Sequence, residues 1–152
     1  MTFLQVLWKK LFPLSAPQKE VLSSAEESKV HDLAKIYHSV NQEYFAGSLS
    51  LTICWYGRKK SARRKGRKVL GYYDQRKECI KIHRTLDDPF FPPYYLAYVV
   101  YHEMLHHVEP PIQGRRKRKV HHHGFTSREK QFKEFSLAKD FEKQNIVKIV
   151  NR

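Results

Sequence analysis

Apolar side chains recur at helical spacing between Ser24 and Gly47. Steps of three and four residues separate Val30, Leu33, Tyr37, Val40 and Tyr44. This spacing places the five side chains on one face and predicts an amphipathic helix over residues 24–47. Ser24 and Glu27 have the pattern of a capping box at its start, and Gly47 is suited to its end.

A period of two follows the predicted helix. In LSLTICWY, residues 49–56, apolar side chains alternate with smaller or polar ones, which predicts a half-buried strand. VLGYY (69–73) and ECIKI (78–82) flank the turn segment DQRK and predict a hairpin. The sequence therefore predicts three strands, and we expect them to form an antiparallel sheet.

Two further apolar segments predict helices. Residues 94–108 are apolar on almost every side, which is typical of a helix buried in the middle of a domain, and Pro110 and Pro111 follow it. One face of a last helix carries Phe125, Phe132, Phe135, Ala138 and Phe141. These elements indicate a compact α+β domain over 23–152, preceded by an N-terminal arm over 1–22.

Length and composition agree with a single domain in a reducing compartment. A chain of 152 residues is long enough to bury a core without disulfides, and its two cysteines, Cys54 and Cys79, lie on predicted strands. No segment approaches the roughly 20 apolar residues of a membrane span. We expect a monomeric cytoplasmic protein without stable membrane insertion.

The chain is strongly basic, with 29 lysine and arginine residues against 15 acidic ones and a net charge of +14. Such an excess favours polyanionic partners, and nucleic acid is favoured over an anionic membrane. The alternative interpretation is a basic surface that only keeps the protein soluble. The charge gathers in RKKSARRKGRK (58–68) and RRKRK (115–119). The candidate nucleic-acid contacts are Arg63, Arg64, Lys65, Arg115, Arg116, Lys117, Arg118 and Lys119.

Aromatic residues on the predicted strands offer a second kind of nucleic-acid contact. Trp55, Tyr56, Tyr72 and Tyr73 are placed where they can stack on the bases of a single strand. Aromatic residues on strands are also common in cores, so packing is the alternative interpretation.

The buried helix carries the strongest candidate chemistry, in VYHEMLHHVEPP at 100–111. His102 and His106 are four residues apart, so a helix brings their Cβ atoms within about 6 Å of each other, close enough to hold one ion. Glu103 lies about 100° around the helix. There its carboxylate reaches a metal-bound water and not the metal, which predicts a zinc hydrolase with Glu103 as general base.

A core helix whose histidines bond to nearby backbone is the alternative interpretation of this motif. We favour zinc, because two imidazoles and a carboxylate without partners are costly to bury in the most apolar helix of the chain. A catalytic zinc ion takes three protein ligands and keeps one position for water. The candidates for the third ligand are Glu129, Glu134 and the triplet His121, His122 and His123, of which the triplet is the richest source.

Three stretches together resemble the SprT-like (Spartan-related) zinc metalloproteases. They are VNQEYFAGSLSLTICW, the helix with HEMLHH, and HHHGF ahead of an aromatic helix, and the resemblance spans about residues 36–141. Members place the third histidine four residues before a phenylalanine, which implies His121 before Phe125 as the ligand, although His123 with Gly124 imitates another pattern of the family. The resemblance also implies a zincin-like, gluzincin-type fold, one catalytic Zn²⁺, and hydrolysis of peptide bonds in proteins bound or crosslinked to DNA.

Two other functions compete with the peptidase. One is a nucleic-acid-binding module whose zinc site is structural, but a structural site has no need for a base at Glu103. The other is a metal-dependent ribonuclease, since histidine-rich zinc helices also occur among RNA-processing hydrolases. Protease and nuclease assays side by side separate the three functions. The candidate partners are thus a protein substrate and nucleic acid, DNA more than RNA.

Overall fold

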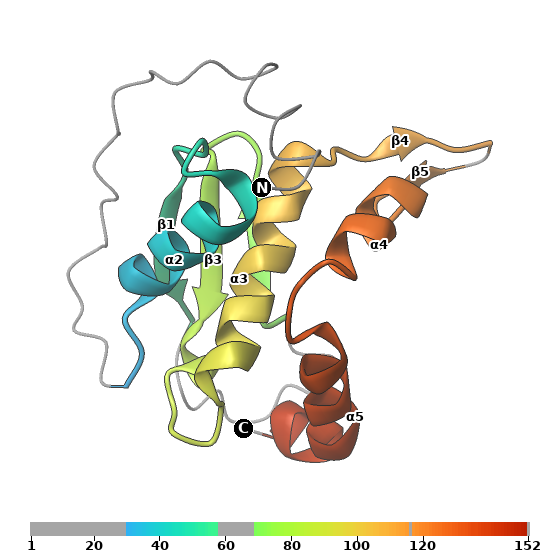
Figure 1. Cartoon of the computed structure of the whole chain (residues 1–152). Helices are drawn as coiled ribbons and strands as arrows, with labels where there is room; N and C mark the ends of the chain where they lie inside the picture. Colours follow the sequence, from blue (N-terminus) through green and yellow to red (C-terminus); the bar gives the residue numbers. More distant parts are fainter. Residues whose placement is uncertain (1–29, 58–68, 116, 152) are drawn as a thin grey trace.

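The computed structural model describes residues 30–57, 69–115 and 117–151. Its elements are α2 (Leu33–Phe45), β1 (Thr52–Tyr56), β2 (Gly71–Asp74), β3 (Cys79–His83), a short 3-10 turn (Arg84–Leu86), α3 (Pro93–Val108), β4 (Ile112–Gln113), β5 (Arg118–Lys119), α4 (His123–Glu129) and α5 (Phe135–Asn151) (Figure 1). Helices and strands are mixed, so the predicted α+β class is confirmed. The predicted boundary between 1–22 and 23–152, and the capping box at Ser24 and Glu27, lie outside the described residues.

Helix α2 begins later than the apolar spacing predicts. Asp32 caps it, and the Asp32 carboxylate accepts a hydrogen bond from the Lys35 backbone N–H at 3.0 Å. Val30 precedes the cap and is 43% exposed, so it is not part of the buried face. The prediction of one continuous helix over 24–47 was wrong, because residues 30–32 are not helical and Asp32 has an extended backbone, although the apolar spacing continues across them. The other end is near Gly47 as predicted, with Ala46 at a left-handed φ of 53°.

The sheet is mixed. Ile53 and Trp55 of β1 are buried while their neighbours are half-buried, which confirms a half-buried strand here, although it begins at Thr52 and not at Leu49 as predicted. Strands β2 and β3 form the predicted antiparallel hairpin. The prediction of a wholly antiparallel sheet was wrong, because β1 pairs with β3 in parallel and the strand order is β1-β3-β2. A period of two identifies a strand but carries no direction. Strand β3 therefore lies in the centre of the sheet, with β1 at one edge and β2 at the other.

Helix α3 lies in the middle of the molecule, as its composition predicts. It has the sheet and α2 on one side and α4 and α5 on the other (Figure 1). Its buried residues are Tyr95, Leu96, Tyr98, Val99, Val100, Tyr101, Glu103, Met104 and Leu105. The apolar members of this set form one core with the inward side chains of the sheet and of α2, so α3 is fixed on most of its circumference.

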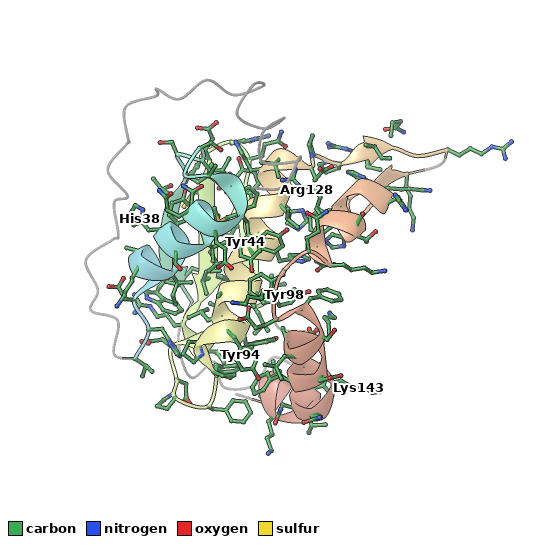
Figure 2. The ribbon with its side chains drawn as sticks, in the orientation of Figure 1. His38, Tyr44, Tyr94, Tyr98, Arg128 and Lys143 are labelled. Carbon is green, nitrogen blue, oxygen red and sulfur yellow. The ribbon has the colours of Figure 1, made fainter. Side chains whose placement is uncertain are left out.

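The last helix is two helices and not one. Helix α4 ends at Glu129 and α5 begins at Phe135, so the prediction of a single helix was wrong. Phe132 lies in the connection and is buried against the rings of Tyr44, Tyr98 and Tyr101. Figure 2 labels Tyr44 on α2 and Tyr98 on α3, which face this connection.

Three smaller features complete the fold. Strands β4 and β5 form a hairpin between α3 and α4 that projects from the body in Figure 1, and the apolar pattern gives no sign of it. Cys54 and Cys79 are free thiols with their sulfur atoms 3.7 Å apart. Within the described residues, no helix combines the length and apolar character that crossing a bilayer requires.

Candidate metal centre

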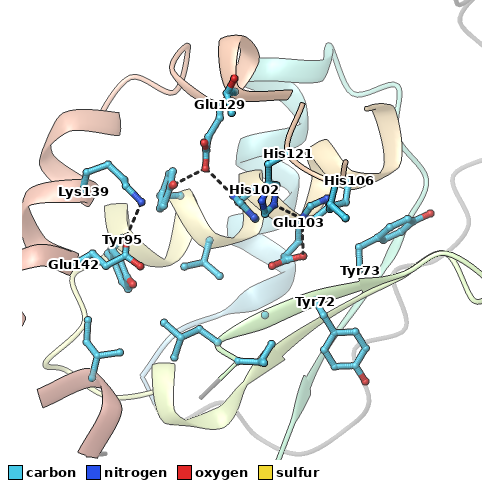
Figure 3. A pocket seen from close by; sticks show the side chains of 18 of the residues that line it. Tyr72, Tyr73, Tyr95, His102, Glu103, His106, His121, Glu129, Lys139 and Glu142 are labelled. Atoms are coloured by element: carbon cyan, nitrogen blue, oxygen red, sulfur yellow. Dashed lines mark hydrogen bonds and ion pairs between the residues drawn. The ribbon is translucent and has the colours of Figure 1, made fainter. Parts of the chain in front are cut away.

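Three histidines converge where α3 meets the start of α4. His102 and His106 project from successive turns of α3, and His121 comes from the segment just before α4 (Figure 3). One ring nitrogen of each lies within 4.8 Å of the others, and the Nε2 atoms of His106 and His121 are 3.4 Å apart. The structure therefore brings together the three residues that the sequence and the resemblance selected, and they could hold a metal ion.

The chain reaches this arrangement by turning back after α3. The β4–β5 hairpin returns it toward the helix, and the fully buried ring of Phe125 then packs beneath the cluster. The Phe125 ring centroid lies 5.0 Å from that of His102 and 4.7 Å from those of His106 and His121. The phenylalanine four residues after His121 thus supports all three imidazoles.

The structure separates the members of the histidine triplet by their surroundings. His122 is the N-cap of α4, where its Nδ1 accepts from the Phe125 N–H at 3.4 Å and its Nε2 donates to the Pro110 carbonyl at 3.2 Å. Both ring nitrogens of His122 are therefore engaged. His123 is the first residue of α4 and is exposed. Of the triplet, only His121 joins the cluster.

Glu129 lies behind His102 and sets its orientation. Glu129 Oε1 accepts hydrogen bonds from His102 Nδ1 at 2.8 Å and from the Tyr98 hydroxyl at 2.7 Å (Figure 3). Burial raises the pKa of Glu129, but these two hydrogen bonds outweigh it and hold the pKa at about 2. The sequence offered Glu129 as a possible ligand; the structure makes it the partner of a ligand and leaves His102 Nε2 for the ion.

The electrostatics of the cluster favour the neutral form of His106 and of His121. Burial, then the charges of His102 and His121, lower the pKa of His106 to about 4. Burial and then His102 also lower the pKa of His121. A neutral imidazole keeps the lone pair that a metal requires. The three ring nitrogens of the cluster fit zinc, which binds imidazole readily and in catalytic sites takes three protein ligands.

Glu103 lies beside the cluster without belonging to it. Its Oε2 is 4.0 Å from His106 Nε2, and its side chain is buried between α3 and β2. Burial raises the pKa of Glu103 to about 7, and His102 and the Tyr73 backbone N–H act against the rise. Gly71 makes room for this carboxylate, because a Cβ there would lie 3.0 Å from Glu103 Oε1. A carboxyl with this pKa can both accept and release a proton near neutrality.

The sequence did not predict one contact at the site, between Tyr73 and His107. The hydroxyl of Tyr73 on β2 is 2.7 Å from Nδ1 of His107, which links the edge strand to α3 next to the cluster. Burial lowers the pKa of His107. In the sequence His107 is only the third histidine of HEMLHH, and no local pattern shows which strand it contacts.

The candidate nucleic-acid contacts fall into three groups. Arg115, Lys117, Arg118 and Lys119 are exposed on the β4–β5 hairpin. Arg116, Arg63, Arg64 and Lys65 lie outside the described residues. Among the aromatic residues, Trp55 is buried, whereas the rings of Tyr56 and Tyr72 lie 5.0 Å apart on the face of the sheet away from α3.

The cluster opens into a cleft of about 850 Å³. Strand β2 and the segment before it form one wall, α3 forms the floor, and α5 closes one end. Pro111 and Val120, at the base of the β4–β5 hairpin, lie at the other end near His121. Searches with protein-family models, among curated proteins and among solved structures found no match. The geometry of the site therefore has to carry the functional conclusion.

Proposed function

We propose that the protein is a zinc-dependent peptidase. The observation that carries the proposal is the position of Glu103, a buried carboxyl with a pKa raised to about 7, beside three converging imidazoles at the floor of a cleft. A structural metal site needs no such neighbour, whereas hydrolysis needs a group that removes a proton from water. The likeness of HEMLHH and HHHGF to SprT-like metalloproteases supports the same conclusion.

His102, His106 and His121 would hold the ion, and Phe125 and Glu129 would fix their rings. When bound, zinc polarises a carbonyl group and makes water acidic enough to lose a proton near neutral pH. Glu103 accepts that proton on its carboxylate as the water oxygen attacks the carbonyl carbon. As the carbon–nitrogen bond breaks, Glu103 returns the proton to the leaving amine.

The edge strand β2 supplies a surface for an extended peptide. Strand β3 occupies only one of its sides, and the cleft lies along the other. The His83 N–H bonds to the Leu70 carbonyl at 2.8 Å, so by the alternation of an antiparallel ladder the backbone groups of Gly71 and Tyr73 face the cleft. The Tyr73 N–H bonds to Glu103. A substrate strand bound at this edge would run past Glu103.

Metal analysis and a protease assay on an unfolded protein test the proposal. We expect about one zinc per chain in the wild type and in Glu103→Gln, but hydrolysis only in the wild type, because the substitution removes the proton acceptor and keeps the ligands. His102→Ala should lose both. Glu43→Gln, at an exposed position of α2, is the matched control and should keep both. Undiminished hydrolysis by Glu103→Gln would refute the assigned role.

The exposed lysine and arginine side chains of the β4–β5 hairpin support a nucleic-acid partner, and we favour DNA over RNA. The hairpin leads directly to His121, so a strand bound to it would hold a DNA-bound protein near the cleft. Replacing Arg115, Lys117, Arg118 and Lys119 by alanine should weaken DNA binding and flatten its dependence on salt, because fewer counterions are released. If the affinity of the wild type for DNA does not depend on the salt concentration, the proposal of a nucleic-acid partner is wrong.

The two rival functions give different results in the same assays. A nucleic-acid-binding module would bind zinc and DNA without cutting protein, and a ribonuclease would cut RNA in a zinc-dependent manner. The peptidase predicts that neither DNA nor RNA is cut. We further propose that the protein acts as a monomer in the cytoplasm, where its two free thiols would stay reduced.

A further inference from the structure

Helix α3 presents two rows of side chains to the cleft. Tyr98, His102 and His106 form one row, and Tyr95, Val99 and Glu103 form the other, each with steps of four residues. Four residues advance about 6 Å along a helix. The first row carries two of the proposed metal ligands. In the second row, Val99 therefore lies about 6 Å before Glu103 along the helix axis, and Tyr95 lies about 12 Å before Glu103.

Tyr95 and Val99 of the second row form the floor of an apolar part of the cleft, which we call the α3–α5 compartment. Its lining residues are Tyr95, Val99, Leu70, Ile146 and Ile149. Tyr95, Val99 and Ile149 are buried, whereas Ile146 is 49% exposed at the mouth. Figure 3 shows Tyr95 at the end of the cleft nearest α5, with Lys139 and Glu142 beside it and Glu103 farther along α3. The compartment is thus apolar at its walls and charged only at its rim.

The Tyr95 hydroxyl is the polar group at the bottom of this compartment. Tyr95 is 1% exposed, and its hydroxyl has no hydrogen-bond partner among the described residues. No fully enclosed side-chain nitrogen or oxygen of the described chain lacks a partner, so this hydroxyl is not fully enclosed, and Tyr95 is one of the residues that line the cleft. Burial and then the nearby Glu142 raise the pKa of Tyr95 and keep the hydroxyl protonated. It is free to pair with a ligand.

We propose that the α3–α5 compartment binds the side chain of a residue that flanks the cleaved peptide bond and selects bulky, mainly apolar side chains, namely Phe, Tyr, Leu and Met. The inference rests on the proposed function, which places the cleaved bond beside Glu103. Neighbouring residues of a peptide have Cα atoms 3.8 Å apart. A side chain next to the cleaved bond therefore reaches a pocket centred about 6 Å along α3. A tyrosine in this position can also bond to the Tyr95 hydroxyl.

Binding of blocked peptides tests the compartment without relying on catalysis. Two peptides that differ only by Phe or Ser at one central residue are titrated into Glu103→Gln, with and without added zinc. We expect the Phe peptide to bind about tenfold to a hundredfold more tightly, the range given by burying one such side chain. Ile146→Asp, made in the Glu103→Gln background, should abolish most of this difference by placing a charge at the mouth.

Val147→Asp in the same background is the matched control. Val147 is the next residue of α5, is 68% exposed and does not line the cleft, so the preference for Phe should survive. Equal affinities for the two peptides, or a preference that Ile146→Asp leaves unchanged, would overturn the inference.

Digestion of a peptide mixture by the wild type separates this inference from the proposed function. Cleavage sites enriched next to bulky apolar residues support both. Cleavage with no such preference overturns the compartment and leaves the peptidase standing. Preferential binding of the Phe peptide without any cleavage overturns the peptidase, and the compartment then stands only as a binding site for apolar side chains.

Discussion

Replacing Glu129 tests whether this residue prepares His102 for metal. Glu129 Oε1 accepts from His102 Nδ1 at 2.8 Å and from Tyr98 at 2.7 Å, and the carboxylate keeps its charge because its pKa is held at about 2. In Glu129→Gln an amide oxygen of nearly the same shape can still accept both hydrogen bonds. The substitution therefore removes the charge and preserves the geometry.

The expected size of the effect follows from these hydrogen bonds. A hydrogen bond to a charged group contributes about 1.5–3 kcal/mol, and one between neutral groups about 0.5–1.5 kcal/mol. The middles of the two ranges differ by about 1.25 kcal/mol, which is close to the roughly 1.4 kcal/mol that changes an equilibrium constant tenfold. We expect Glu129→Gln to bind zinc about tenfold more weakly, and Glu129→Ala up to about a hundredfold more weakly, as is usual when the partner of a metal-bound histidine is lost.

Competition with a chromophoric chelator measures the apparent Kd for zinc in each variant. Denaturant unfolding of the metal-free proteins, measured in parallel, separates lost metal affinity from lost stability. Glu43→Gln on α2 changes the same charge at an exposed position and should bind zinc as the wild type does. If both Glu129 variants also retain wild-type affinity, Glu129 does not position His102 and this interpretation of the site is wrong.

Three further predictions follow from single positions. His121→Ala should bind less than a stoichiometric amount of zinc while His123→Ala remains fully loaded, since only His121 joins the cluster; equal zinc content by atomic absorption would contradict the ligand assignment. Gly71→Ala should keep its zinc but lose hydrolysis at least tenfold, because the new Cβ, 3.0 Å from Glu103 Oε1, displaces the base; unchanged kcat would refute that reasoning. Phe132→Ala should lower the free energy of unfolding by about 3–5 kcal/mol through the cavity it leaves, whereas Leu137→Ala, at an exposed position, should change it by at most about 0.5 kcal/mol; similar losses in both would mean that the connection between α4 and α5 is not packed as described.

Much of the local structure could be predicted because its signal lies within a few residues. The alternation in 49–56 located β1 with its start three residues too early, and the apolar run 94–108 located α3 to within one residue of its start. A helix also fixes the relative placement of His102, Glu103 and His106, whatever surrounds it. The errors arose where a pattern continued past a break, as at Val30 before α2 and across the connection between α4 and α5.

The sequence by itself determined the three strands β1 to β3, the buried helix α3, the basic character of the chain and two of the three histidines, because periodicity, charge and helical spacing are local properties. Only the tertiary structure decided that β3 runs parallel to β1, that His121 meets α3 while His122 caps α4, and that Glu129 holds His102. These outcomes depend on how segments far apart in the chain pack against each other. Direction, ring orientation and choice of partner are set by that packing, in which Phe125 and Phe132 fill the space between α3 and the C-terminal helices.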